Sequence, residues 1–271
     1  ILNLAAFIQG PKWMPRFFRS ETRQTAATIR RLITKLTKDR LDMIAAGGAP
    51  DDLATKILTT KDPVTGDTLS LDEMVDQVAI FFLAGHETSA SALAWALYLL
   101  AQYPDWQTKL AAEGQAYDGA FANLAGLQDT RNVFRETLRL YPPVPMMVRE
   151  TTQPEVFRGR DVKPGAQVVV SPWHLHRHAR LWDAPDAFDP ARFGTENGKA
   201  CLRDAYIPFS AGPRICTGAG FALIEGVVVL ARLLACYEFS VIADKTPVPV
   251  AHLTVRARDG IWLRISARKV G

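Results

Sequence analysis

The feature that most constrains the fold is a long apolar run over residues 67–103. Ser70 and Glu73 form a helix-capping pair at its start and Pro104 follows its end, so the pattern predicts one α-helix from about Leu71. About thirty residues at a rise of about 1.5 Å make a helix of about 45 Å, which is long enough to cross a whole domain. Because this helix is apolar on nearly every side, it belongs either in a protein core or in a bilayer.

Four consecutive polar residues decide between these two environments. His86, Glu87, Thr88 and Ser89 lie at the midpoint of the run, where polar and charged side chains cost a membrane-spanning helix most. A composition of 48% hydrophobic and 22% charged residues in a chain of 271 is typical of a globular protein. The run therefore predicts a buried helix at the centre of a protein core.

The rest of the chain indicates a mainly α fold with a minor β part. No Ser/Gly linker, low-complexity tract or internal repeat marks a boundary, so we expect a single domain over residues 1–271. The strands should lie mainly after Pro145, and the last of them should form a hairpin around the turn Asp259-Gly260. Apolar spacing predicts further helices over Ser20–Met43, near Asp129–Leu140 and over Gly220–Ala235.

Charge and cysteine content argue against several classes of protein. The net charge of +4 is mild, and residues 11–20 mix aromatic with basic side chains. A solvated surface is the first interpretation of this segment, and a peripheral contact with anionic lipid is the alternative. No second basic and aromatic cluster supports nucleic-acid binding. Three cysteines without a C-x-x-C pair favour neither a disulfide framework nor a zinc site, and they fit a reducing cytoplasm.

The stretch FSAGPRICTGAG, residues 209–220, places one cysteine among three glycines just before an apolar helix. The glycines permit positive φ angles and a close approach by a flat or bulky ligand. Cys216 would lie near the amino end of the helix and near Arg214, and both favour a thiolate over a thiol. The loop therefore indicates anionic sulfur chemistry.

Four interpretations of Cys216 are open at this point. A phosphatase-like nucleophile would need an arginine six residues later, where Ala222 stands, although other thiol enzymes lack that requirement. A zinc site would need further Cys or His residues within the loop. A lone thiolate can ligate haem iron, because the porphyrin supplies the other four ligands. A buried structural cysteine before a helix is the fourth interpretation.

The loop resembles the haem-binding signature of the cytochrome P-450 family, F-x-x-G-x-R-x-C-x-G. In this sequence the pattern is satisfied by Phe209, Gly212, Arg214, Cys216 and Gly218. Three further elements of the family occur in the expected order: AGHETS in the long helix, Glu136-x-x-Arg139 before a proline run, and FDPARF. The chain is similar to the carboxy-terminal portion of such an enzyme, of bacterial appearance, with the amino-terminal part of the fold missing.

The resemblance implies a cofactor, haem b (iron protoporphyrin IX), and residues that hold it. Cys216 would be the axial ligand of the iron, with Phe209 packed beside the sulfur. Arg214 and Arg149 would each pair with a haem propionate through charge-assisted hydrogen bonds. The other implied cofactor contacts are Ala84, Gly85, Gly212 and Gly218.

The resemblance also implies an acid and alcohol pair and a buried ion network. Glu87 and Thr88 would deliver protons during oxygen activation, although a mid-helix Thr also commonly bonds back to the carbonyl four residues earlier. By spacing alone, Glu136 and Arg139 would form a weak surface pair. The family pattern joins them to Arg192 in a buried network with a structural role.

The expected function is that of a haem-thiolate monooxygenase, which inserts one oxygen atom from O2 into a small apolar substrate. Its electrons would come from NAD(P)H through a ferredoxin or a flavoprotein reductase, because the chain has no G-x-G-x-x-G fingerprint of its own. The pocket residues are merely apolar, so they do not specify the substrate. The cytoplasm is the expected location.

Two rival hypotheses come from other classes. His174, His176 and His178 alternate along the segment WHLHRH, so on a strand they would share one face and could bind a metal. The plainer interpretation is a set of polar residues at a strand end. A non-haem metal or thiol enzyme would use these histidines or Cys216, and the other rival is a non-catalytic truncated fragment.

Overall fold

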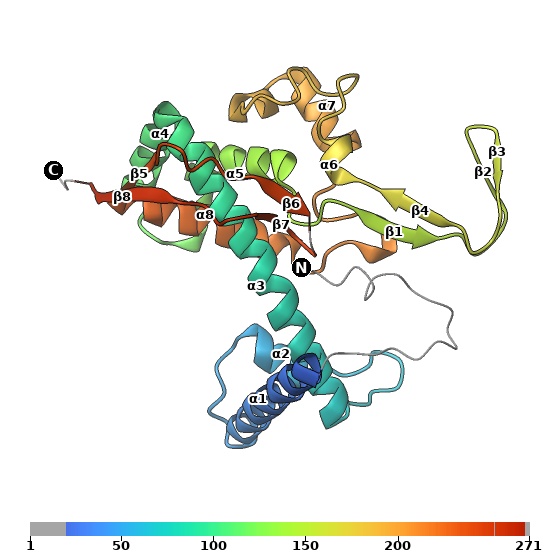
Figure 1. The fold of residues 1–271 in the computed structure, drawn as a ribbon. Coiled ribbons are helices and arrows are strands. Elements are labelled where there is room, and N and C mark those ends of the chain that lie inside the picture. The colour runs from blue at the N-terminus through green and yellow to red at the C-terminus, as the bar shows by residue number, and fades with distance from the viewer. Residues whose placement is uncertain (1–19, 252, 269–271) are drawn as a thin grey trace. The chain divides into compact units, whose positions relative to one another are not determined.

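Helices dominate the computed structural model, which describes residues 20–251 and 253–268 (Figure 1). The strands are short and form antiparallel pairs, so the prediction of a mainly α fold with a minor β part is confirmed. Contacts within the chain gather into two compact units, residues 1–86 and 87–271. Their boundary falls inside the longest helix, where the sequence shows no linker.

The first unit consists of α1 (Ser20–Ala45), α2 (Leu53–Thr59) and the first half of α3 (Leu71–Gln102). The predicted capping box is present at the start of α3. Ser70 donates to Glu73 Oε2 from its backbone N–H and from its hydroxyl, over 2.8 and 2.7 Å. Both ends of the long helix therefore lie where the sequence predicts them.

The predicted apolar face of α1 is only partly buried. Ile33 is 5% exposed, whereas Leu32 and Leu36 are 53% and 61% exposed. The segment expected to contact lipid, residues 11–20, lies outside the described residues except for Ser20. That expectation stays a prediction.

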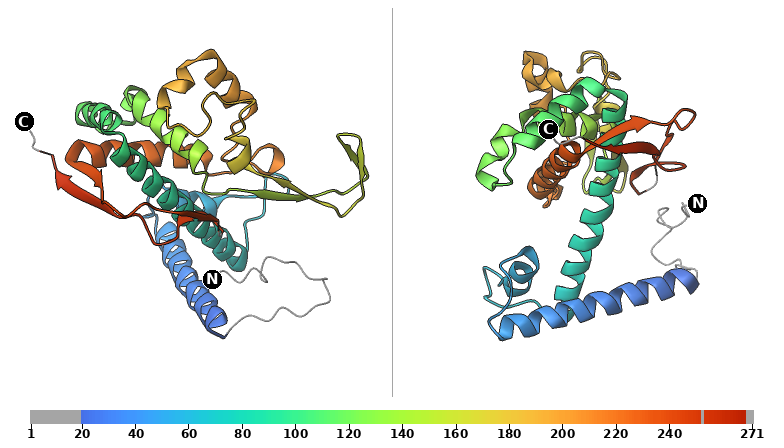
Figure 2. Two further views of the ribbon diagram at one scale, coloured as in Figure 1. Left: turned by 45° about the horizontal axis from the view of Figure 1, so that its top comes forward. Right: turned by 90° about the vertical axis from the view of Figure 1, so that its left-hand side faces the viewer.

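The second unit has its core between the second half of α3, α4 (Pro104–Ala116), α5 (Gln128–Leu140) and α8 (Ala219–Cys236). Figure 2 shows these helices from two sides. Leu230, Ala231 and Leu234 of α8 are fully buried. Among the described residues, α8 is the one helix long and apolar enough to cross a membrane. However, α8 packs against α4 and α5, so its length and apolar composition are also those of a core helix.

Two glycines let these helices approach one another closely. A Cβ on Gly114 of α4 would lie 2.1 Å from the carbonyl oxygen of Ala231, and one on Gly226 of α8 would lie 2.3 Å from the Phe134 ring. Carbon atoms cannot approach that closely, so any side chain at either position would force α8 away from its neighbour.

The remaining elements are short, and most of them connect α5 to α8 or follow α8. They are η2 (Phe121–Gly126), β1 (Met147–Glu150), β2 (Glu155–Phe157), β3 (Arg160–Val162), β4 (Gln167–Val170), α6 (Pro172–Leu175), η3 (Pro190–Gly194), α7 (Glu196–Asp204), η4 (Gly212–Arg214), β5 (Tyr237–Val241), β6 (Pro249–Ala251), β7 (Val255–Ala257) and β8 (Leu263–Ala267). The antiparallel pairs are β1 with β4, β2 with β3, β5 with β8, and β6 with β7.

The hairpin predicted at the end of the chain is wrong. The turn itself forms, because Gly260 has a φ of +81° and donates its N–H to the carbonyl of Ala257. The strands on either side of it pair elsewhere, β7 with β6 and β8 with β5. β5 directly follows α8 and offers β8 five residues in register, with Phe239 opposite Ile265, which is more than the three-residue β7 could offer.

We expect Gly114→Ala to destabilise the protein, because the added Cβ would clash with the backbone of α8. The loss in the free energy of unfolding should be about 1 to 3 kcal/mol, measured by urea denaturation. Gly126→Ala is the matched control, since a Cβ there would meet no described atom within 4 Å. Equal stability of Gly114→Ala and the parent would show that the α4–α8 contact is looser than the structure indicates.

Candidate functional site

The cysteine loop is a closed turn that ends directly before α8. The backbone N–H of Cys216 donates to the carbonyl of Phe209 over 2.8 Å. Gly212 and Ser210 have φ angles of +68° and +67°, so the chain bends sharply between these two residues. The thiol of Cys216 is free and exposed, three residues before α8 begins at Ala219.

The space beside the thiol fits a flat apolar group with a single protein ligand. A Cβ on Gly212 or Gly220 would meet no described atom within 4 Å. Ile215 and Phe221, on either side of the sulfur in sequence, are 57% and 68% exposed. No three His, Cys, Asp or Glu residues gather to hold a metal ion in the described part of the chain. The loop offers one soft sulfur, and haem iron requires no more than that from the protein.

Arg149 is the residue outside the loop that the structure brings to it. Its Nη2 donates to Ser210 Oγ over 3.1 Å, and its Nη1 donates to the carbonyl of Val148 over 3.0 Å. Arg214 lies at the end of η4 and is exposed. Two guanidinium groups thus lie on or next to the cysteine loop. The sequence analysis did not single out Ser210.

The polar segment of α3 contacts α8 and the strands that follow α8 in the chain. Ser89 Oγ donates to Glu225 Oε2 of α8 over 2.8 Å. Thr88 and Glu87 are half-buried on the same turn, while Ala84 and Gly85 occupy the preceding turn, in the first unit. The Ser89–Glu225 bond joins the polar stretch of α3 to the helix that follows Cys216.

Glu87 has partners that the sequence analysis missed. Its Oε1 accepts a hydrogen bond from Thr254 Oγ1 over 2.5 Å and one from Arg256 Nε over 2.8 Å, and Arg256 Nη2 completes an ion pair. These donors lie more than 160 residues away along the chain, and no motif marks them. Only the folded chain could reveal the contact.

Glu136, Arg139 and Arg192 form a buried ion network. Arg139 donates from Nε and Nη2 to the two carboxylate oxygens of Glu136 over 2.8 and 2.9 Å, and Arg192 Nε donates to Oε1 over 3.0 Å. Glu136 and Arg139 are fully buried, and Arg192 is 5% exposed. One carboxylate between two cations leaves an excess positive charge, which needs further acceptors.

Backbone carbonyl groups supply those acceptors, and no sequence pattern indicated them. Arg139 Nη1 donates to the carbonyls of His176 and Pro185 over 2.8 and 2.5 Å. Both arginines donate to the carbonyl of Ala187, over 2.9 and 3.1 Å. The turn around residues 183–187 therefore wraps the two guanidinium groups, and Ala184 takes a φ of +41° within it.

The expectation that His174, His176 and His178 share one face of a strand is wrong. Pro172 starts the helical turn α6, so the three side chains diverge. His174 is exposed and bonds to Ser171 Oγ over 2.9 Å, while His178 Nδ1 accepts the N–H of Arg180 over 3.2 Å. His176 is fully buried. The histidine cluster is therefore no metal site.

His176 instead connects the ion network to the cysteine loop. Its carbonyl accepts from Arg139, and its ring Nε2 accepts the N–H of Ile207 over 2.9 Å, two residues before Phe209. Its ring stacks on Tyr206 with centroids 5.3 Å apart. Burial lowers the pKa of His176 from 6.5 to about 4, so the ring is neutral and available as an acceptor.

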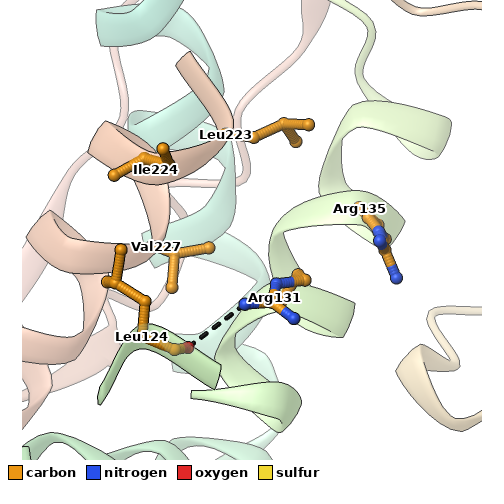
Figure 3. Close-up of a pocket in the computed structure, with 6 residues that line it drawn as sticks. All are labelled: Leu124, Arg131, Arg135, Leu223, Ile224 and Val227. Carbon is orange, nitrogen blue, oxygen red and sulfur yellow. Dashed lines mark hydrogen bonds between the residues drawn. The ribbon is translucent and has the colours of Figure 1, made fainter. Parts of the chain in front are cut away.

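A hollow of about 210 Å³ lies between α5 and α8 (Figure 3). Arg131 and Arg135 of α5 border it, and Arg131 Nη2 donates to the carbonyl of Leu124 over 3.1 Å. Burial lowers the pKa of the Arg135 guanidinium from its usual value, with the charge of Arg131 adding to the effect. The hollow combines an apolar floor with two cations, and its other lining residues are Leu124, Leu223, Ile224 and Val227.

The family model described as Cytochrome P450 matches residues 3–263 of the sequence. The chain belongs to the cytochrome P-450 family. Cyclooctatin synthase of Streptomyces melanosporofaciens is 38% identical over 190 residues, which are 69% of this chain and 41% of that protein. Human cytochrome P-450 4F2 is 37% identical over 223 residues, which are 79% of this chain and 42% of that protein.

Solved cytochrome P-450 structures have the same fold. The crystal structure of a cytochrome P-450 called CYP102L1 is 32% identical, with a TM-score of 0.83 over 92% of this chain and 58% of that one. The cytochrome P450DA heme domain is 31% identical, with a TM-score of 0.79 over 90% of this chain and 55% of that one. The chain thus spans less than half the length of these curated relatives and somewhat more than half of these heme domains.

We expect the ion network to contribute strongly to stability. Glu136→Leu would leave two buried guanidinium groups without their carboxylate, at a cost of about 3 to 5 kcal/mol in the free energy of unfolding. Glu196→Leu is the matched control, because Glu196 also pairs with a cation three residues later but is exposed, so it should cost less than about 1 kcal/mol. Urea denaturation of both variants measures the difference, and equal losses would contradict the role assigned to Glu136.

His176→Gln should make stability less dependent on pH. The unfolded chain binds a proton at the His176 ring near pH 6.5, whereas the folded chain binds it only near pH 4. The stability that depends on the neutral ring is therefore complete above pH 6.5 and is lost as the pH falls toward 4, by about 3 kcal/mol. Gln keeps an acceptor for Ile207 but does not titrate.

Urea denaturation at several pH values between 4 and 7 measures this effect. The free energy of unfolding of His176→Gln should change less across that range than that of the parent. His178→Gln, which replaces an exposed histidine, should follow the parent. An unchanged slope for His176→Gln would contradict the burial of a neutral ring.

Proposed function

We propose that this chain is part of a haem-thiolate monooxygenase in which the Cys216 thiolate would hold the haem iron. The observation that carries the proposal is the free, exposed thiol in a glycine-rich loop beside exposed apolar side chains, in a chain of the cytochrome P-450 family. When bound, haem b would supply oxygen activation, in which substrate, O2, two electrons and two protons yield a hydroxylated product and water. We also propose that both compact units belong to one functional domain.

The residues around the loop have distinct parts in this proposal. Cys216 would hold the haem iron through its sulfur, and Phe209 holds the loop closed through its carbonyl. Arg149 and Arg214 would bind the two propionates, and Arg149 is held next to the loop by Ser210. The remaining contacts to the cofactor would come from Ala84, Gly85, Gly212 and Gly218.

Glu87 and Thr88 have the role of proton delivery. Glu87 is held as an ion pair with Arg256, which keeps a carboxylate on the half-buried face of α3 without leaving its charge uncompensated. Thr88 is its neighbour and carries a hydroxyl that can both accept and donate a proton. Together they can pass protons from solvent to the side of α3 where substrate and oxygen would bind.

The proposed partners are a small apolar substrate and an external electron donor. A ferredoxin or a flavoprotein reductase would bring electrons from NAD(P)H. An acidic donor is favoured by Arg131 and Arg135, which place two cations and an apolar hollow between α5 and α8 (Figure 3). We propose the cytoplasm as its location, with the alternative of peripheral membrane contact through residues 11–20.

Cys216→Ala should abolish the haem-thiolate spectrum of the whole protein. The measurement is the absorption spectrum of the reduced carbonyl complex, whose Soret band is red-shifted when a thiolate ligates the iron. Cys236→Ala is the matched control, because Cys236 is also a free, exposed cysteine but ends α8. A red-shifted band that persists in Cys216→Ala would overturn the assignment. A whole protein that binds no haem and consumes no reductant would favour a thiol enzyme or a non-catalytic scaffold.

A further inference from the structure

One face of α3 is bonded to an extended segment near the end of the chain. Glu87, Ser91 and Trp95 follow one another at intervals of four residues, so they lie on the same face of the helix. Ser91 Oγ and Trp95 Nε1 both donate to the carbonyl of Val255, over 2.5 and 3.3 Å. Three successive turns of α3 therefore hold residues 254–256, at the start of β7.

The same segment is fixed from its other side. The backbone N–H of Val255 donates to the carbonyl of Pro143 over 2.9 Å. Thr254 and Val255 are each only 2% exposed. Because side chains alternate along an extended chain, Thr254 and Arg256 point to the side opposite Val255. Both of them reach Glu87, so the backbone of this segment determines where two donors to Glu87 lie.

The contacts from Thr254 and Arg256 to Glu87 converge on a single oxygen atom. Oε1 accepts from the Thr254 hydroxyl and from Arg256 Nε, and it is also the atom paired with Arg256 Nη2. A hydroxyl and a guanidinium on one oxygen fix the rotamer of the side chain as well as compensating its charge. An ion pair on the open surface would add little stability. Here the Glu87 side chain is only 29% exposed and Thr254 is buried, so solvent screens these contacts less.

We infer that Thr254 and Arg256 are positioning residues for the Glu87 carboxylate. They hold its Oε1 so that the side chain keeps one orientation on α3 next to Thr88. The inference rests on the proposed function, because the orientation matters for catalysis only if Glu87 delivers protons. The segment 254–256 would then connect proton delivery to the β6–β7 pair, which lies beside α3 (Figure 1).

The first test separates positioning from substrate binding in the whole, haem-loaded protein. Arg256→Met should lower kcat about tenfold and change KM less than twofold, and more of the consumed electrons should appear as hydrogen peroxide. Arg256→Lys keeps a cationic donor and should restore most of the loss. Arg264→Met removes an exposed arginine from β8 and should behave as the parent. A parent-like kcat and peroxide yield for Arg256→Met would overturn the inference.

The second test measures the contact through protein stability and needs no catalytic measurement. In a double-mutant cycle, Arg256→Met should lower the melting temperature of the parent by about 2 to 4 °C and that of Glu87→Met by less than about 1 °C. Thr254→Val should likewise lower the melting temperature of the parent more than that of Glu87→Met. Equal losses in both backgrounds would show that the two side chains are not coupled, and the inference would fail.

The outcomes distinguish this inference from the proposed function. If the parent lacks the red-shifted Soret band, the proposed function fails, while the melting temperatures still test the contact. If the band is present in the parent and in Arg256→Met but the cycle is additive, only the inference fails. Coupled melting temperatures with an unchanged kcat would assign Thr254 and Arg256 a purely structural role and would also overturn the positioning role.

Discussion

The cysteine loop depends on a buried carboxylate that is shared by two arginines. Glu136 binds Arg139 and Arg192 away from solvent, and Arg139 also binds the carbonyl of His176. The ring of that histidine accepts the N–H of Ile207, and the chain then enters the loop that presents Cys216. A charged group in the core is costly unless all its hydrogen bonds are made. The network therefore fixes one arrangement of the segments around it and, through His176, the start of the loop.

A second polar system lies on the central helix. The apolar side chains in the second half of α3 pack in the core of the second unit, whereas Ile80, Phe82 and Leu83 in the first half are exposed, contrary to the expectation of a helix buried along its length. The polar midpoint of α3 makes specific bonds to α8 and to the segment before β7. Ser89 bonds to Glu225 and Glu87 bonds to Thr254 and Arg256, so these two side chains, on different faces of α3, bind different parts of the chain. Polar groups that would weaken an isolated apolar helix thus determine what packs against it.

Much of the site could be predicted from sequence because its residues are close together in the chain. Phe209, Gly212, Arg214 and Cys216 occupy one loop, and Glu136 and Arg139 are one helical turn apart. The partners that sequence analysis missed are distant or are backbone atoms. Arg256 lies 169 residues after Glu87, and the carbonyls that surround Arg139 carry no side-chain signal. The expected histidine strand was wrong because Pro172 starts a helical turn there, which alternation of residue types alone could not show.

The sequence by itself determined the long central helix, with its capping box and its proline boundary, the family, and the glycine-rich loop that contains Cys216. These features are local, because they follow from helical periodicity, capping and the spacing of residues within short motifs. Only the tertiary structure decided how the final strands pair, that Arg149 reaches the cysteine loop through Ser210, and which side chains hold Glu87. Those contacts join residues far apart in the chain, and their formation depends on the packing of the whole unit rather than on any local preference.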